Sequence, residues 1–101
     1  MGQPDDLPAT LRSAATARLH LRVRGQVQGV GFRPYVYRLA NELALSGSVR
    51  NDGAGVAIDV QGSSAALDNF WQRLAQEAPP LTRIHSLASG IAALVHGESS
   101  F

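Results

Sequence analysis

Residues 18–47 read RLHLRVRGQVQGVGFRPYVYRLANELALSG. Apolar and polar side chains alternate over residues 18–24, which is the period of a strand with one buried face. Residues 25–33, GQVQGVGFR, form a loop with three glycines, and Pro34 stands where a helix can begin without losing a needed N–H group. The apolar residues that follow have the i, i+3, i+4, i+7 spacing of a helix: Val36, Leu39, Ala40 and Leu43. The segment therefore predicts a strand, a glycine-rich loop and a helix, with Gly47 as the left-handed stop of that helix.

The sequence after this helix predicts a β-hairpin. Residues 48–51 form a short strand, and Asp52-Gly53 is a turn signal. Alternation between apolar and polar side chains then resumes over residues 56–61, as expected for the second strand of the hairpin.

A second helix and a fourth strand complete the pattern. Ser63 or Ser64 can cap the helix, and the proline pair at residues 79–80 ends it. Its apolar stripe has helical spacing and consists of Leu67, Phe70, Trp71 and Leu74. Residues 81–88 predict the fourth strand, although their apolar side chains do not share one alternating phase. Residues 90–101 are ambiguous.

The order of elements is therefore β-α-β-β-α-β. Two amphipathic helices, each with one apolar stripe, can cover one face of an antiparallel sheet and leave the other face in water. The sequence thus predicts an α+β fold, a ferredoxin-like βαββαβ sandwich with both helices on one face of the sheet. Residues 1–17 show no sustained period and predict a flexible tail, so we expect the folded domain to be residues 18–101.

Composition narrows the classes of function. A chain of 101 residues with 45% apolar residues has the size of one domain with a single core. Nine basic residues against eight acidic ones give a net charge of +1, which argues against a nucleic-acid partner. The absence of cysteine excludes a thiol nucleophile and fits a cytoplasmic protein. We expect no export signal and no membrane partner, because no signal-peptide pattern and no apolar run of ~18 residues occurs.

The loop before the first helix has the features of an anion site. Unpaired main-chain N–H groups and the positive end of the helix dipole meet there. Arg33 falls at this positive end, where a cation is disfavoured by roughly 0.3 to 1 kcal/mol unless an anion balances it. A residue that breaks a local rule without compensation often marks a functional site, so we expect Arg33 to bind a phosphate group.

Asn51 is the second candidate site residue. If the first two strands run parallel around the crossover helix, Asn51 and the glycine loop lie at the same edge of the sheet, about two strand spacings or ~10 Å apart. Taken singly, each feature has an ordinary explanation, because glycine loops are often plain turns and Asn before Asp-Gly favours a turn. Their coincidence at one edge favours a site. The three histidines lack metal-ligand spacing, so no metal is expected.

These residues also carry a family resemblance. The segments VRGQVQGVGFRPYVYRLA and GSVRNDGAGVAIDVQG, within residues 19–89, resemble the acylphosphatase family. Gly31, Pro34 and the segment APPLTRIHSL at residues 78–87 are more similar to the amino-terminal domain of the carbamoyltransferases that mature NiFe hydrogenases.

The resemblance implies roles for the candidate residues. It makes Arg33 the phosphate-binding arginine and Asn51 the residue that orients the attacking water. The residues that it implies for the phosphate cradle are Gln26, Val27, Gln28, Gly29 and Val30. It implies carbamoyl phosphate as the natural ligand, no cofactor in this domain, and a fifth edge strand that would be truncated near Phe101. The implied partners are downstream domains of the same chain and a hydrogenase maturation protein.

Two functional hypotheses remain open from the sequence. In the first, the domain is an enzyme that hydrolyses acyl phosphates by positioning and charge stabilisation. In the second, it is a noncatalytic anion-binding module that serves downstream carbamoyltransferase domains. An RNA-binding module on the same fold would display stacking aromatics on its inner strands, and residues 56–61 contain none.

Overall fold

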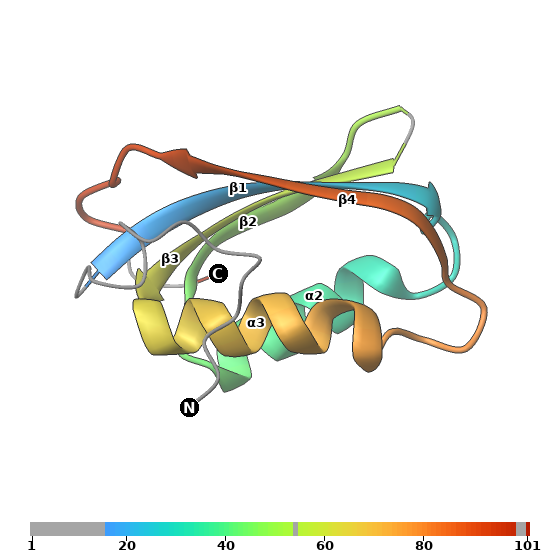
Figure 1. Ribbon diagram of the computed structural model, residues 1–101, viewed down its shortest axis with the longest axis horizontal. Coiled ribbons are helices and arrows are strands. Elements are labelled where there is room, and N and C mark those ends of the chain that lie inside the picture. Colours follow the sequence, from blue (N-terminus) through green and yellow to red (C-terminus); the bar gives the residue numbers. More distant parts are fainter. Residues whose placement is uncertain (1–15, 54, 99–100) are drawn as a thin grey trace.

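The computed structural model describes residues 16–53, 55–98 and 101. Its elements, in chain order, are β1 (Thr16–Gln26), α2 (Phe32–Glu42), β2 (Ser46–Asn51), β3 (Gly55–Ser63), α3 (Ser64–Gln76) and β4 (Arg83–Ala92). The predicted βαββαβ order is confirmed (Figure 1). The predicted tail lies outside the described residues except for Thr16 and Ala17, which extend β1 by two residues. Neither α2 nor α3 is long and apolar enough to cross a membrane.

The four strands form one antiparallel sheet in the order β2-β3-β1-β4. Because β1 and β2 are both antiparallel to β3, which lies between them, they run parallel to each other and finish at the same end of the sheet. Both helices cover one face of the sheet, and neither lies on the other face (Figure 1). The predicted ferredoxin-like sandwich is therefore confirmed.

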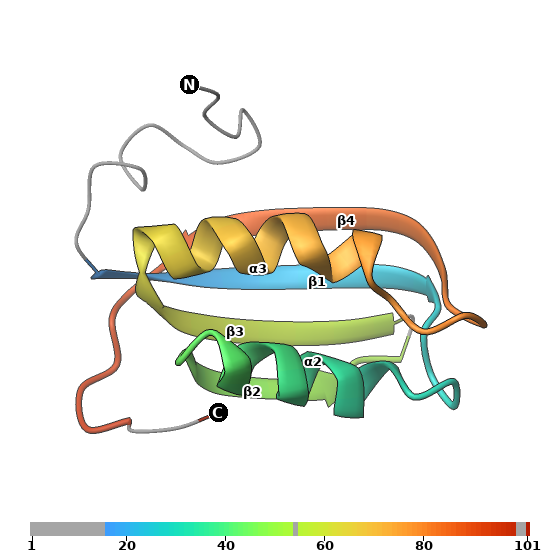
Figure 2. The ribbon, with the colours of Figure 1, turned by 90° about the horizontal axis from the view of Figure 1, so that it is seen from below.

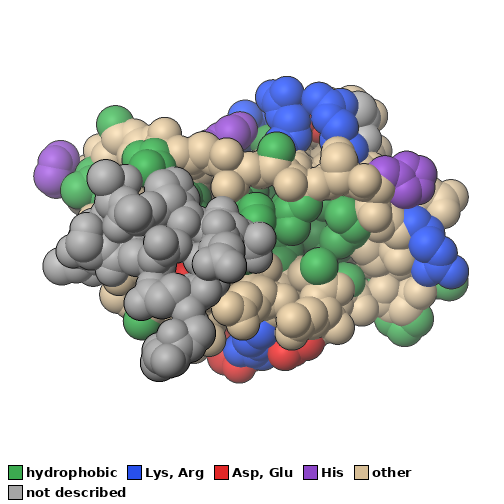
Figure 3. All heavy atoms as spheres, in the orientation of Figure 1, with side chains coloured by type: hydrophobic (Ala, Val, Ile, Leu, Met, Phe, Trp, Pro, Cys, Tyr) green, Lys and Arg blue, Asp and Glu red, His purple; other side chains and the backbone are tan. Residues whose placement is uncertain are grey.

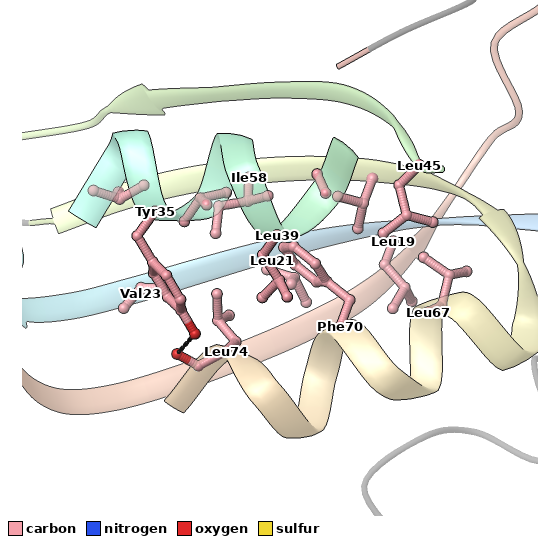
Figure 4. Packing of buried hydrophobic residues seen from close by; sticks show 14 of the residues in the cluster. Leu19, Leu21, Val23, Tyr35, Leu39, Leu45, Ile58, Leu67, Phe70 and Leu74 are labelled. Carbon is pink, nitrogen blue, oxygen red and sulfur yellow. Dashed lines mark hydrogen bonds between the residues drawn. The ribbon is translucent and has the colours of Figure 1, made fainter. Parts of the chain in front are cut away.

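The core lies between this face of the sheet and the two helices (Figure 4). The alternation predicted for β1 places its apolar side chains on the helix-covered face, opposite those of β3 in the register. Fully buried side chains from both layers include Leu19, Leu21, Val23, Ile58, Phe70 and Leu74. Packing of the core therefore fixes the positions at which β1 and β2 end.

The prediction for the end of the first helix was wrong. α2 ends at Glu42, and Ala44, with a φ of 58°, occupies the left-handed position that was predicted for Gly47. The Leu45 N–H group donates to the main-chain oxygen of Ala40 at 2.9 Å, which closes the helix end as a Schellman-type cap does. Gly47 lies within β2 instead, where the backbone of β3 leaves no room for a Cβ atom.

A β-bulge explains why the last strand lacked one alternating phase. The strand covers Arg83–Ala92, which is later than the predicted residues 81–88. The register with β1 skips His85, so the side chains on either side of this residue are shifted by one position. As a result Ile84 and Leu87 both pack against the core despite their odd spacing.

The chain after β4 returns across the end of the sheet that lies opposite the β1–α2 loop (Figure 2). The Arg18 guanidinium pairs there with the Glu98 carboxylate at 2.8 Å. The Phe101 ring then lies 6.2 Å, between centroids, from that of Tyr37 on α2. The fifth edge strand implied by the resemblance stays a prediction.

Tyr35 joins the two helices from within the core. Its hydroxyl group donates to the main-chain oxygens of Arg73 and Leu74 on α3, the second at 3.0 Å (Figure 4). Burial of the phenol raises the pKa of Tyr35 to about 12. The folded protein therefore holds this proton at a pH where the unfolded chain has released it.

We expect Tyr35→Phe to lower the free energy of unfolding by about 1 kcal/mol at pH 8, because the hydrogen bond from the Tyr35 hydroxyl group to the end of α3 is lost. The raised pKa stabilises the wild type fully below pH 10, and this contribution is lost as the pH rises from 10 toward 12. The difference between wild type and variant should therefore fall in urea unfolding at pH 11.5. The chain has no lysine to titrate in this window, and the exposed Tyr37→Phe serves as the control. Parallel pH profiles for wild type and Tyr35→Phe would contradict the prediction.

Candidate functional site

The sheet brings Asn51 and the glycine loop to one end of the molecule. Asn51, the last residue of β2, pairs with Val56, which in turn pairs with Val23 of β1. Asn51 therefore lies two strands, about 10 Å, from β1 near the point where β1 ends. Because directly paired residues share a face, Asn51 lies on the helix-covered face of the sheet. Figure 2 shows that both strands point to the end where α2 begins.

The loop itself needs glycine at two positions. Gly29 and Gly31 have φ values of 75° and 85°, a left-handed conformation that a side chain would strain. α2 begins directly after the second of these glycines, at Phe32, two residues before the start predicted at Pro34. Pro34 is accommodated because the N–H groups of the first helical turn have no partner within the helix.

The amino-terminal end of α2 has no capping side chain. Gly31 is the N-cap residue, and the first turn contains no acidic residue. α3 differs, because the Ser63 Oγ atom accepts a hydrogen bond from the Ala66 N–H group at 3.1 Å. The first N–H groups of α2 and the positive end of its dipole are thus left for an anion to satisfy.

Arg33 lies in this uncapped first turn. Its side chain is exposed and makes no ion pair or hydrogen bond with any residue that the structure describes. The arginines that pair with carboxylates are Arg18, Arg22, Arg50 and Arg73. An unpaired guanidinium beside a positive helix end is the conflict that the sequence predicted, and a bound anion would resolve it.

The five predicted cradle residues differ in what they can offer an anion. Gln26 is the exposed last residue of β1. Val27 is buried in the core and Val30 packs against it, so these two residues can contact an anion only through main-chain groups. The Gln28 Nε2 group donates to the main-chain oxygen of Gly55 at 2.9 Å. Gly29, described above, has no side chain and leaves its main chain accessible.

Sequence reasoning missed Asp52 as part of this region. The Asp52 N–H group donates to the Gly55 oxygen at 3.0 Å, and the Asp52 Oδ1 atom accepts from the Gly55 N–H group at 3.1 Å. The other carboxylate oxygen lies 3.5 Å from the Arg22 Nε atom on β1. The Asp-Gly-x-Gly sequence is a signal for such a turn, because an aspartate side chain accepts from nearby main-chain N–H groups.

Two surface grooves lie away from these residues. One is between the helices and is lined by Tyr35, Arg38, Leu39, Glu42, Arg73 and Glu77. The other lies between α3 and β4, and Figure 3 shows hydrophobic side chains gathered along it. Neither of these two grooves is lined by Arg33 or Asn51.

Comparison with known proteins identifies the family of the chain. Residues 19–101 match the family model of acylphosphatases. The chain belongs to the acylphosphatase family. The resemblance drawn from the loop and the Asn51 segment is thereby confirmed.

Relatives of this acylphosphatase domain occur in two settings. The carbamoyltransferase HypF2 of Cupriavidus necator is 58% identical over 81 residues, which cover 80% of this chain and 10% of that protein. An acylphosphatase of Staphylococcus aureus is 38% identical over 68 residues, which cover 67% of this chain and 76% of that protein. A crystal structure of full-length HypF in a phosphate- and nucleotide-bound form has a TM-score of 0.81 at 29% identity, covering 85% of this chain and 11% of that chain. The chain thus spans a small part of the carbamoyltransferases and most of the free-standing acylphosphatase.

Proposed function

We propose that this acylphosphatase domain binds acyl phosphates at the β1–α2 loop and hydrolyses them, with carbamoyl phosphate as its natural ligand. The observation that carries the proposal is Arg33, an exposed cation in an uncapped first helical turn that has no partner among the described residues. The similarity to a carbamoyltransferase supports carbamoyl phosphate as the ligand.

In the proposed mechanism, the main-chain N–H groups of the cradle, residues 26–30, and the planar fork of Arg33 hold the phosphoryl oxygens. Asn51 holds a water molecule in line with the bond to be broken. The water oxygen bonds to phosphorus, the bond between phosphorus and the acyl oxygen breaks, and the carboxylate leaves with the electron pair while the water proton passes to solvent. Because a carboxylate is a good leaving group, positioning and charge stabilisation suffice, and the mechanism uses no metal or cofactor.

A noncatalytic module is the second candidate function. The similarity to a carbamoyltransferase favours it, because the matching domain makes up only 10% of that protein and the rest of that chain could carry the catalysis. In this case the same loop would hold carbamoyl phosphate for downstream domains and for a hydrogenase maturation partner. Both functions include binding of the acyl phosphate, but only the first includes its hydrolysis.

Release of inorganic phosphate from carbamoyl phosphate and benzoyl phosphate, measured in the presence of EDTA, separates the two functions. We expect the wild type to hydrolyse both substrates. Asn51→Ala should lower kcat roughly 10²- to 10³-fold, because the Asn51 amide no longer positions the attacking water. Inhibition by inorganic phosphate should change by less than about twofold, since the Arg33 contact is intact. Asn69→Ala, an exposed asparagine on α3, is the matched control.

The source of the oxygen gives a second readout. When benzoyl phosphate is hydrolysed in ¹⁸O-labelled water, the label should appear in the released phosphate rather than in benzoate. A wild type that binds phosphate but releases none from either substrate would favour the binding module. Full activity in Asn51→Ala would remove Asn51 from the site.

A further inference from the structure

One side chain links the glycine loop to the turn that follows Asn51. Gln28 is in the loop, and its Nε2 group reaches the Gly55 oxygen at 2.9 Å, across 27 positions of sequence. Asp52 holds the same glycine from the other side through two hydrogen bonds, at 3.0 and 3.1 Å. The Gly55 oxygen therefore accepts from both segments, and we call Gln28, Asp52 and Gly55 the loop tie.

The middle of the loop tie is a fixed point in the sheet. Gly55 is buried at the start of β3, and a Cβ atom there would lie 1.9 Å from the main-chain oxygen of Val23. Its backbone is thus packed directly against β1. A side chain that bonds to this backbone sets the position of an otherwise exposed loop relative to the sheet.

The chemistry of the Gln28 amide argues against a direct contact between its oxygen and a phosphate. The Gly55 oxygen is an acceptor, so the NH₂ group of Gln28 must face it. The amide oxygen of Gln28 is itself an acceptor and repels a phosphoryl oxygen. One N–H of this amide is thus used to hold the loop to the start of β3.

We propose that Gln28 and Asp52 are positioning residues that fix the phosphate-binding loop relative to Asn51. Asp52 follows Asn51 directly in the chain, so holding Asp52 to Gly55 also holds the end of β2. The inference rests on the proposed function, in which the loop holds phosphorus and Asn51 holds water. A misplacement of about 1 Å between reacting groups costs roughly 10²-fold in rate, so a loop left untied should act slowly.

Kinetics of Gln28→Met test the tie, because methionine keeps the length of the side chain and removes the donor. We expect kcat to fall by about tenfold, while KM and inhibition by inorganic phosphate change by less than twofold. In the Asn51→Ala background, Gln28→Met should lower kcat by less than a further twofold, because the water holder is already absent. Gln61→Met is the matched control, since the Gln61 side chain bonds to the Val95 main chain near the opposite end of the sheet.

The proposal would be overturned if Gln28→Met lowered kcat tenfold both in the wild type and in the Asn51→Ala background. A rise in KM with kcat unchanged would also overturn it. Either result would assign Gln28 to ligand binding or to catalysis independent of Asn51. An unchanged kcat in Gln28→Met would overturn it as well.

Amide hydrogen exchange tests the same tie without any substrate. In Gln28→Met, the amides of residues 27–31 and those of Asp52 and Gly55 should exchange about tenfold faster, whereas Gln61→Met should leave them unchanged. Asp52→Ala should reproduce the faster exchange in the loop. Unchanged exchange at Asp52 and Gly55 in Gln28→Met would overturn the tie. If the expected exchange accompanied an inactive wild type, the tie would stand and the hydrolytic function would fail.

Discussion

Arg33→Ala should lower kcat/KM for carbamoyl phosphate by about 10³-fold or more and leave the protein as stable as the wild type or slightly more so. The loss of rate follows because a guanidinium that faces a transferring phosphoryl group stabilises the charge of the transition state. The gain in stability follows because a cation in the first turn of a helix costs roughly 0.3 to 1 kcal/mol when no anion is bound. Phosphate-release assays and urea unfolding, without added phosphate, measure the two effects on the same preparations.

Arg38→Ala is the matched control for this experiment. Arg38 is an exposed arginine of the same helix, and its loss changes the net charge by the same amount. Arg33→Lys keeps the charge but loses the planar fork, and we expect it to recover only part of the rate. Equal activity in Arg33→Ala and Arg38→Ala would contradict the site. A loss of stability in Arg33→Ala would mean that Arg33 has a structural role that its exposed position does not show.

The elements with one clear period could be predicted from the sequence. β1 follows a strict alternation, and α3 is capped by Ser63, one of the two serines predicted for this role. In both cases the signal is local, because one face of the element is buried and the other is exposed. The order of these elements was enough to predict the sheet and the shared edge at which β1 and β2 end.

Features that depend on the neighbouring strand could not be predicted. The bulge at His85 is set by pairing with β1, and no pattern within β4 specifies which residue is skipped. The helix stop at Ala44 was missed because glycine is the usual residue in the left-handed position, whereas here Gly47 is needed inside β2. In each case a contact across the sheet outweighed the local preference.

The same distinction applies to the site. Arg33 could be found because its conflict with the helix dipole is visible in the sequence alone. The hydrogen bond from Gln28 to Gly55 joins two loops that only the strand register brings together. The sequence therefore suggested the residues proposed to bind the ligand, but not the hydrogen bond that joins the two loops.

Phe70→Ala should lower the free energy of unfolding by about 3 to 5 kcal/mol, a large share of the ~5 to 15 kcal/mol typical of a whole domain. The Phe70 ring is fully buried between α3 and the sheet, beside Leu39 and Leu21 (Figure 4). Removing the ring leaves a cavity, which could be filled only if the helices and the sheet moved closer together. Urea unfolding followed by circular dichroism measures the loss, and Phe70→Leu should lose much less because most of the volume is kept.

Inorganic phosphate links this core variant to the site. A ligand that binds only the folded state stabilises it by RT ln(1 + [L]/Kd), so phosphate at about 100 times its Kd should return roughly 2.7 kcal/mol to Phe70→Ala. The double variant Phe70→Ala, Arg33→Ala should gain almost none of this, although both proteins start with the same damaged core. An equal gain in the two would mean that phosphate binds elsewhere on the domain. A gain confined to proteins with Arg33 would show that the anion site and the hydrophobic core belong to one cooperative unit.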